Sequence, residues 1–120
     1  MWEYHQRSGA LARSDVIYGH GYSGHGSGLN APDHETEPGI GPIPRGHWRI
    51  GAFSDGHPHL GPFVAALTPQ GHTAHGRSEF FIHGDNKSGN RSASHGCIIA
   101  NRALREALAG SGDTDLMVLA

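Results

Sequence analysis

The chain has 120 residues, which is the length of one domain, and we treat residues 1–120 as a single unit. Its 9 basic and 11 acidic residues give a formal net charge of −2, which argues against a nucleic-acid-binding protein, because such domains are strongly basic. No apolar run approaches the roughly 20 residues of a membrane-spanning helix, and residues 1–5 lack the basic and apolar regions of a secretory signal peptide. We therefore expect a protein without a membrane span or a recognisable signal peptide.

Glycine, proline and histidine are frequent in this chain. It contains 19 glycines, 7 prolines and 11 histidines, whereas hydrophobic residues make up 36%. Frequent glycine and proline favour short strands joined by turns over a helical bundle. The aromatic residues are spread along the chain and favour an ordered core over disorder. We therefore expect a mainly β domain, and the single cysteine, Cys97, excludes an internal disulfide.

The N-terminal part of the chain predicts a hairpin followed by a long loop. Residues 2–5 alternate apolar and polar side chains, as a half-buried strand does, and residues 7–9 are typical of a turn. Residues 10–13 then form the returning strand of the hairpin. Residues 19–46 contain eight glycines and four prolines, which predicts a long irregular loop. A loop of this length inside a compact domain is usually functional, as a binding loop or a lid.

The rest of the chain predicts four strands and one helix. Alternation or short apolar runs place the strands at residues 47–50, 62–67, 79–82 and 116–119. Residues 69–73 contain proline and glycine and predict a turn. A helix is expected to begin at Asn101, a favourable N-cap residue, and Gly110 is placed to end it. The fold expected from the residues is therefore mainly β with one short helix.

Two short motifs late in the chain carry reactive side chains. An apolar run ends in His83, and a turn of small and polar residues leads into Cys97. A nucleophilic cysteine requires a base within hydrogen-bond reach and a thiol pKa lowered from about 8.5, because the thiolate is the attacking species. His83 is the natural partner for such a thiol. From the residues alone, a catalytic pair and an inert structural cysteine remain equal alternatives.

These motifs resemble those of a known enzyme family. Residues 82–84 (Ile-His-Gly), followed by residues 94–97 (Ser-His-Gly-Cys), resemble the signature of the L,D-transpeptidase catalytic domain, the YkuD-like family. Residues 41–48 are similar to the segment before the third strand of its short members, and residues 77–85 to the run leading into the family histidine. Residues 2–11 resemble the opening hairpin. The likeness covers most of the chain, and it is strongest to the short branch known as type VI secretion effectors that attack peptidoglycan.

The resemblance implies a fold and a reaction. The fold is an L,D-transpeptidase-like β-sandwich or barrel of short strands, with the short helix after the cysteine. In the reaction, Cys97 is the nucleophile and His83 the general base. The thiolate attacks the carbonyl of the L-centre of meso-diaminopimelate in a peptidoglycan stem peptide, releases D-alanine and leaves a thioester. If the acyl group is then transferred to water, the enzyme is an L,D-carboxypeptidase. If it is transferred to an amine, the enzyme is an L,D-transpeptidase or a D-amino-acid exchange enzyme. Neither reaction requires a cofactor or metal.

The resemblance also implies roles for the neighbours of the pair. The backbone carbonyl of Gly84 would orient His83. The residues before the cysteine, Ser94, His95 and Gly96, would shape the site and supply backbone N–H groups to the oxyanion, the usual source of stabilisation in acyl transfer. These assignments place the oxyanion pocket around the turn that carries the cysteine.

The residues that hold the substrate carboxylate are expected among the cations of this region. Many family members carry an arginine two positions after the cysteine, where Ile99 stands here, and Arg102 is the candidate to replace it. From Arg77 to Arg105 five basic and two acidic residues give a local charge of +3, which would attract the free carboxylates of a stem peptide. We therefore expect Arg102, Arg77 and Asp85 at the substrate-binding rim.

The same branch implies partners and a location. The substrate would be peptidoglycan stem peptides, and an antibacterial effector would require an immunity protein and a secretion apparatus. The protein would be secreted without a recognisable signal peptide and would act in the bacterial periplasm.

Two other classes of function remain open. A zinc-dependent hydrolase would use loop histidines, in which the pairs His57 and His59, or His72 and His75, are joined by His83. Neither pair has the helical spacing of known zinc-protease motifs. The second alternative is a non-catalytic module that binds the cell wall and has kept the fold.

Overall fold

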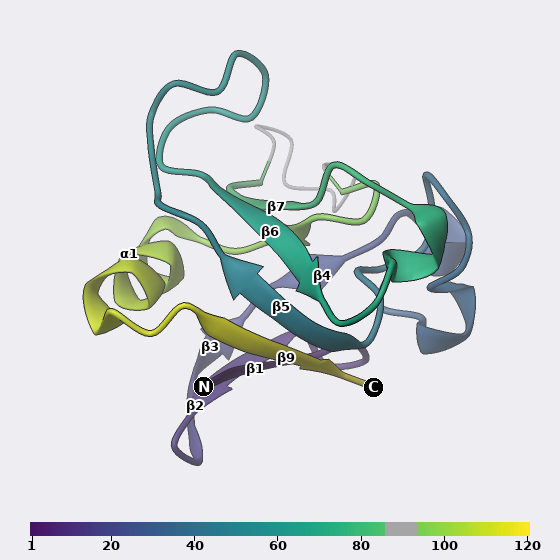
Figure 1. The fold of residues 1–120 in the computed structure, drawn as a ribbon, viewed down its shortest axis with the longest axis horizontal. Helices are drawn as coiled ribbons and strands as arrows, with labels where there is room; N and C mark the ends of the chain where they lie inside the picture. The colour runs from purple at the N-terminus through teal and green to yellow at the C-terminus, as the bar shows by residue number, and fades with distance from the viewer. Residues whose placement is uncertain (86–93) are drawn as a thin grey trace.

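The two edge strands of the sheet follow one another in the sequence. The computed structural model describes residues 1–85 and 94–120, and within them nine strands form one sheet in the order β3-β2-β1-β9-β5-β6-β7-β8-β4 (Figure 1). The edge strands are β3 (Val16–His20) and β4 (Tyr22–Ser23), so the sheet curls into a nearly closed barrel. This confirms the predicted mainly β fold with a single short helix. The other elements are β1 (Trp2–His5), β2 (Ala10–Arg13), β5 (Gly46–Ile50), β6 (Ala65–Gln70), β7 (Phe81–His83), β8 (Ile98–Ile99), α1 (Arg102–Ser111) and β9 (Asp115–Leu119), with 3-10 turns at Gly26–Gly28, Pro32–His34 and Ala74–Gly76.

Gly21 is the residue at which the barrel closes. It joins β3 to β4, and its N–H donates to the carbonyl oxygen of Gly9 at 2.8 Å. A Cβ atom at Gly21 would lie 2.1 Å from the carbonyl oxygen of Ile99 in β8, and one at Gly9 would lie 1.9 Å from the carbonyl oxygen of Gly21. Both contacts are impossible for a side chain, so glycine is required for the backbones to approach this closely.

The predicted hairpin and the predicted last strand are confirmed. β1 and β2 pair antiparallel over Trp2–Tyr4, and β9 lies between β1 and β5, parallel to the first and antiparallel to the second. Several of the most deeply buried side chains come from these strands and from the segment before β5. Trp2, Tyr4, Ile43, Trp48 and Leu116 are each no more than 1% exposed and form the centre of the core.

The prediction of an irregular loop at residues 19–46 is wrong for its first residues, which lie in strands. β3 begins at Val16 and β4 occupies Tyr22–Ser23, and neither strand shows an apolar–polar alternation. In β3 the side chains of Val16, Ile17 and Tyr18 are all exposed, which removes the pattern that identifies a half-buried strand. Residues 24–45 are irregular, as predicted, apart from two 3-10 turns.

Three further boundaries differ from the prediction. β6 spans residues 65–70 instead of 62–67, and it continues through Pro69 because β7 pairs only with its first two residues, so no partner needs the missing N–H. The turn predicted at residues 69–73 therefore starts only after Gln70. β7 starts at Phe81 instead of residue 79, since Glu79 has a left-handed φ of +65° that interrupts the strand.

The helix α1 begins where the sequence predicts and ends two residues later than expected. The Asn101 side chain accepts a hydrogen bond from the Leu104 N–H at 2.9 Å, as an N-cap does. The C-terminal cap is Gly112, with φ +69°, instead of Gly110. The short strand β8, which precedes the helix, was not predicted, because two isoleucines alone show no periodicity.

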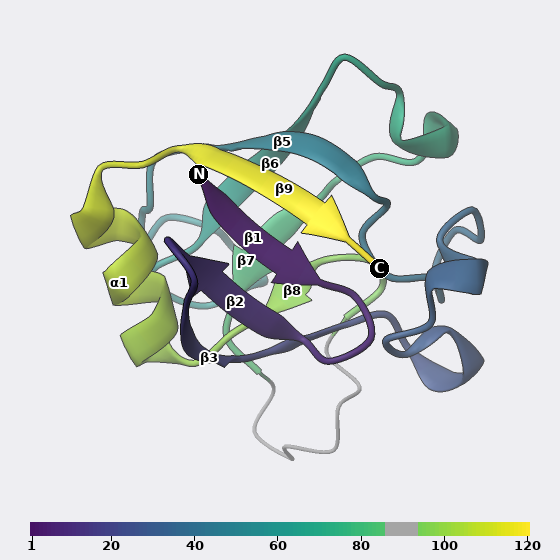
Figure 2. The same ribbon diagram turned by 90° about the horizontal axis from the view of Figure 1, so that it is seen from below.

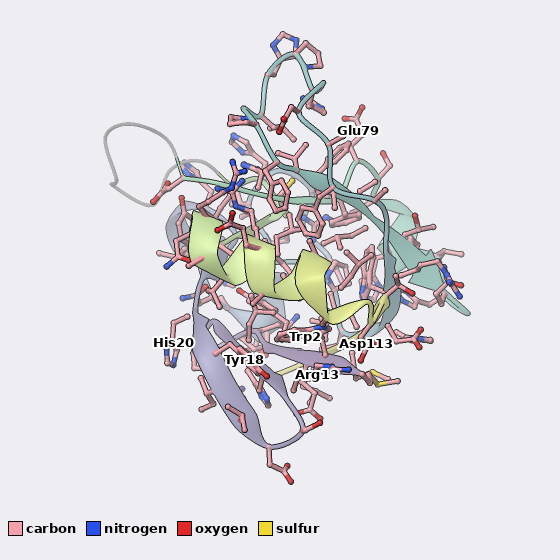
Figure 3. All side chains as sticks on the ribbon, turned by 90° about the vertical axis from the view of Figure 1, so that its left-hand side faces the viewer. Trp2, Arg13, Tyr18, His20, Glu79 and Asp113 are labelled. Carbon is pink, nitrogen blue, oxygen red and sulfur yellow. The ribbon has the colours of Figure 1, made fainter. Side chains whose placement is uncertain are left out.

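Side-chain contacts attach α1 to the hairpin. The Trp2 indole N–H donates to Ser111 Oγ at 3.1 Å, and the Arg13 guanidinium lies 3.0 Å from the Asp113 carboxylate. Figure 3 shows Trp2, Arg13, Asp113 and Tyr18 beside the helix, where the Tyr18 ring packs edge-on against Trp2. In Figure 2 the helix lies at one end of the barrel and residues 24–45 at the other. Among the described helices, none has the length and apolar character to cross a membrane.

A buried carboxylate holds the long segment 24–45 against the barrel. Glu35 Oε1 accepts hydrogen bonds from Gln6 Nε2 at 3.0 Å and from Arg45 Nε at 2.8 Å, and its Oε2 lies 2.8 Å from His75 Nε2. Burial alone would raise the pKa of Glu35, but the hydrogen bonds from Gln6, His75 and Arg45 together lower it from 4.5 to about 2. One ionised side chain thus connects the segment 24–45 to two other segments of the chain, through Gln6 and His75.

We expect the Glu35 network to make folding stability depend on pH in the acid range. Because the pKa of Glu35 is lower in the folded chain, its contribution is fully present above about pH 5 and is lost as the pH falls toward 2. The shift corresponds to about 3 kcal/mol. Glu35→Gln should therefore lower the free energy of unfolding at pH 7 by about this amount, and the difference from wild type should narrow on acidification. Urea titrations at pH 7 and pH 3 measure both quantities.

The matched control is Glu3→Gln, which changes an exposed glutamate of β1. This variant should behave as wild type at both pH values. Asp113, whose pKa is also lowered to about 2, first by the hydrogen bond from the N-terminal amino group, supplies the acid sensitivity that all three proteins share. Equal stability of Glu35→Gln and Glu3→Gln at pH 7 would contradict the prediction.

Candidate functional site

The candidate nucleophile and base come from two neighbouring parallel strands. Ile82 pairs with Ile98, and His83 with Ile99, in the ladder of β7 and β8. Cys97 directly precedes β8, so this register places it opposite Phe81. Side chains alternate along a strand, and Cys97 and His83 therefore lie diagonally on one face, at a Cα spacing of roughly 7–8 Å that side chains can bridge.

That face is the outer face of the barrel. Ile82 and Ile98, on the opposite face, are 2% and 0% exposed and belong to the hydrophobic core. The structure thus brings together the two residues that the sequence pairs, on the side of the sheet that a substrate can reach. Cys97 is partly exposed, whereas His83 is buried.

The His83 ring is oriented by the backbone of the next residue. Its Nδ1 lies 2.8 Å from the carbonyl oxygen of Gly84, and because a carbonyl only accepts, the proton sits on Nδ1. This is the orienting contact expected for Gly84. The other ring nitrogen, Nε2, is buried and has no hydrogen-bond partner among residues 1–85 and 94–120. A neutral imidazole in this tautomer presents a free lone pair, as a general base requires.

Burial sets the protonation state of both residues. It lowers the pKa of His83, as does the nearby positive charge of Arg105, while the Gly84 carbonyl raises it in part. Burial also raises the pKa of the Cys97 thiol, which the Phe81 N–H and the Arg77 charge lower only in part. The resting pair is therefore a neutral thiol beside a neutral imidazole. This differs from the expected thiol with a lowered pKa, because desolvation outweighs the stabilising contacts.

A strained residue sits next to the nucleophile. The Cys97 Sγ atom lies 3.7 Å from the carbonyl oxygen of Glu79, the residue with φ +65°. A non-glycine residue in this region costs on the order of 1–3 kcal/mol, and such strain is concentrated at functional sites. The left-handed conformation turns the Glu79 carbonyl toward the thiol, where it accepts the S–H.

Ser94 fixes the turn that carries the nucleophile. Its fully buried hydroxyl donates to the Cys97 carbonyl oxygen at 2.7 Å and accepts from the N–H groups of Gly24 and Gly96 at 3.0 and 3.1 Å. The Ser23 hydroxyl donates to the Gly96 carbonyl oxygen at 3.2 Å. Ser94 therefore holds the backbone of the turn that carries Cys97. The Gly96 N–H is already used in this turn, so it does not point freely at an oxyanion.

Arg77 binds backbone carbonyl groups of this turn and of the segment 24–45. Its guanidinium donates to the carbonyl oxygens of Glu35, Gly41, Pro42 and His95 at 2.6 to 3.3 Å. A Cβ atom on the neighbouring Gly96 would lie 2.5 Å from its Nη2 atom, so glycine is needed there. The structure places Arg77 beside the site, as expected, but its donors bind the protein's own carbonyls. Its charge acts on the Cys97 thiol.

His95 contacts the long segment 24–45. Its Nδ1 lies 2.9 Å from the carbonyl oxygen of Gly39, and its ring lies 5.4 Å from the ring of His25. The side chain is exposed. The structure therefore places His95 against the 24–45 segment, where it attaches this segment to the nucleophile turn.

Asp85 lines a cavity beside His83. This cavity has a volume of about 430 Å³, and its lining includes Tyr22, Ile99 and Asn101. The Tyr22 hydroxyl donates to Asp85 Oδ1 at 2.7 Å. Ile99 lies on the same face of β8 as Cys97, so the cavity opens next to the pair. Ile99, the position at which the resemblance to the L,D-transpeptidase family implied an arginine in many members, is an apolar part of the cavity lining.

The two arginines of α1 have different surroundings. Arg102 is exposed, and its guanidinium lies 4.3 Å from the centre of the Phe63 ring. Arg105 is buried and donates to the carbonyl oxygens of Pro62 and Phe63 at 3.0 and 2.8 Å, and to that of Ala100. The sequence counted Arg105 only as part of the basic patch, although its place beside Leu104 on the apolar side of the helix was a signal of burial. Two other basic residues of the predicted patch, Lys87 and Arg91, lie outside the described residues.

The zinc alternative requires a cluster of ligand side chains. Within residues 1–85 and 94–120, no group of three His, Cys, Asp or Glu side chains is arranged to hold a metal ion. His72 Nε2 instead lies 2.9 Å from the carbonyl oxygen of His47, and His75 bonds to Glu35. These two histidines therefore have structural partners.

Comparison with known protein families gives a match over most of the chain. A family model described as the Tlde1 domain matches residues 18–112, which is most of the chain and includes both His83 and Cys97. A search of curated proteins returns no match.

We expect the Cys97 thiol to react slowly at neutral pH. Because burial raises its pKa, the alkylation rate with iodoacetamide should rise with pH and reach half its maximum above the usual value of about 8.5. Arg77→Met should shift this midpoint further upward, since it removes a positive charge that lowers the pKa, whereas Arg77→Lys keeps the charge. Mass spectrometry of the alkylated protein gives the rates.

N-acetylcysteine is the reference thiol, and near-ultraviolet circular dichroism checks that both variants keep their tertiary packing. A midpoint at or below that of N-acetylcysteine would contradict the neutral resting state of the thiol.

Proposed function

The chain belongs to the Tlde1 domain family of type VI secretion effectors, which act on peptidoglycan, and on this premise we propose that it is a cysteine-dependent acyltransferase of stem peptides. Its activity would be that of an L,D-carboxypeptidase, an L,D-transpeptidase or a D-amino-acid exchange enzyme. The observation that carries the proposal is the parallel pairing of β7 and β8, which sets Cys97 and His83 on one accessible face. The Gly84 carbonyl supports it by leaving the His83 Nε2 lone pair free.

In the first half of the reaction, the thiol attacks the substrate carbonyl. His83 Nε2 takes the S–H proton as the Cys97 sulfur forms its bond to the carbonyl carbon of the diamino acid. The tetrahedral intermediate then collapses, the C–N bond to the terminal D-alanine breaks, and the imidazolium of His83 protonates the leaving amine. The product is a thioester between Cys97 and the shortened stem peptide.

In the second half, an acceptor releases the acyl group. His83 removes a proton from water or from the amine of a D-amino acid, and the acceptor oxygen or nitrogen attacks the thioester. The C–S bond breaks and the proton returns to the sulfur, which restores the neutral pair. The raised pKa of the Cys97 thiol fits this sequence, because the proton moves only as the sulfur attacks.

The proposed setting is the periplasm of a target bacterium. A secretion apparatus would deliver the protein there without a signal peptide, and an immunity protein would protect the producing cell from the same reaction on its own peptidoglycan. A change confined to the stem peptides would leave the glycan strands intact.

The decisive experiment is mass spectrometry of disaccharide-tetrapeptide muropeptides after incubation with the protein. We expect tetrapeptide to disappear, with tripeptide as the product of hydrolysis, or with a mass change at the terminal residue when a D-amino acid is added. Cys97→Ala should abolish either product, and His83→Gln should lower the rate by about 10²–10⁴-fold, the typical contribution of a positioned base.

The matched control for His83→Gln is His59→Gln, an exposed histidine of the segment between β5 and β6. It should convert the muropeptide at the wild-type rate. Conversion by Cys97→Ala that disappears with a chelator would establish the zinc hydrolase instead. Binding to sacculi without any conversion would identify the non-catalytic module.

Arg102 is the exposed cation proposed to attract the substrate carboxylate. Arg102→Gln should raise KM for the tetrapeptide about two- to fivefold and leave kcat unchanged, because an exposed charge contributes only modestly to binding. Arg7→Gln, an exposed arginine in the turn between β1 and β2, is the control. Steady-state rates of D-alanine release give both constants. Equal KM values for the two variants would remove Arg102 from substrate binding.

A further inference from the structure

A second cavity lies on the outer face, on the side of the pair away from Asp85. It has a volume of about 430 Å³. Its floor is formed by β6 and β7, and its wall is the segment that joins β5 to β6 and projects beyond the sheet in Figure 1. The residues that line it include Ala52, Ser54, His57, Val64, Ala66 and Phe81.

This cavity begins directly beside the nucleophile. Ala66 of β6 pairs with Phe81 of β7, and the register of β7 and β8 places Phe81 opposite Cys97. The three residues thus form one row across the sheet, on one face, with neighbouring strands about 4.8 Å apart. The Phe81 N–H contacts the Cys97 thiol. A group bound over Ala66 and Phe81 would therefore be within one or two strand widths of the attacking sulfur.

His57 presents a hydrogen-bond donor at this cavity. Its Nδ1 accepts from the N–H groups of His59 and Leu60 at 3.1 and 3.2 Å, so in the neutral ring the proton is on Nε2. The ring packs edge-on against Phe81, with their centres 5.0 Å apart. No residue in the described parts of the chain accepts a hydrogen bond from Nε2–H.

The lining determines which chemical group fits. Ala66, Val64 and Phe81 offer an apolar surface for methylene groups, while the His57 Nε2–H offers a donor beyond it. None of the residues that line the cavity is acidic, and Asp55 of the same segment accepts from the Phe63 N–H at 2.9 Å instead. An aliphatic chain whose end carries a carboxylate finds a hydrogen-bond donor here, whereas a chain that ends in an ammonium group alone finds no carboxylate among the lining residues.

We propose that this cavity binds the side chain of the residue whose carbonyl Cys97 attacks, and that His57 recognises a carboxylate at the end of that side chain. The inference rests on the proposed function and adds a specificity-determining residue to it. Diaminopimelate carries such a carboxylate beside the ammonium group of its distal carbon, whereas lysine, which occupies the same position in other stem peptides, ends in an ammonium group alone. The cavity would therefore select stem peptides by their third residue.

The test compares two substrates and three variants. The substrates are disaccharide-tetrapeptides with diaminopimelate or lysine at the third position. His57→Asn keeps an acceptor for the two backbone N–H groups of the segment and removes the Nε2–H donor. Ala66→Leu fills the floor of the cavity at an exposed position on the outer face, and His59→Asn is the matched control with an unchanged cavity.

Wild type should prefer the diaminopimelate peptide. His57→Asn should raise KM for this peptide about tenfold, with a smaller change in kcat, and leave KM for the lysine peptide unchanged, because only the first loses a hydrogen bond to a charged group. Ala66→Leu should raise KM for both peptides, and His59→Asn for neither. Equal KM values for His57→Asn and wild type on the diaminopimelate peptide would overturn the subsite and leave the proposed function intact.

A binding measurement separates this subsite from the reaction. Calorimetric titration with the diaminopimelate peptide compares the Cys97→Ala variant with the Cys97→Ala, His57→Asn double variant. Neither protein has the cysteine, so the measurement does not depend on turnover. Weaker binding of the double variant supports the subsite even if the wild-type protein converts no muropeptide. Equal binding, or no binding by either protein, overturns it.

Discussion

The parallel pairing of β7 with β8 is the constraint on which the site depends. A parallel ladder holds two strands in fixed register without a hairpin to connect them, so the distant residues His83 and Cys97 become neighbours only through this pairing. The same register sends Ile82 and Ile98 into the core. Burial of these two side chains thus fixes the orientation of the reactive ones, because a slip by one residue would turn every side chain to the other face.

Polar contacts, more than apolar packing, hold the nucleophile turn in place. Ser94 bonds within the turn, and Arg77 binds four backbone carbonyls around it. One of those carbonyls belongs to Glu35, whose ionised side chain connects the long segment to the barrel. A chain with 36% hydrophobic residues thereby positions an irregular segment precisely enough to pack against the cysteine. The cost of this close packing is desolvation, which keeps both Cys97 and His83 neutral.

The outer face is divided by the pair into two cavities of similar size. The one beside His83 contains Asp85 and the Ile99 wall, and the one beside Cys97 contains Phe81 and His57. A reaction that joins or separates two groups needs space on both sides of the reacting carbonyl. A single sheet supplies this space, because Phe81 of β7 lines the cavity on one side of the pair and Ile99 of β8 lines the cavity on the other.

The sequence by itself determined the features that depend on local order. It predicted the first hairpin and the last strand from alternation, the helix from the Asn101 cap, and the candidate pair from its motifs. Only the tertiary structure decided the strands without periodicity, the neutral state of the thiol, and the partners of the arginines. A sequence shows that Arg77 and Arg105 are charged, but their acceptors are backbone carbonyls from distant segments, and only the folded chain brings such atoms together.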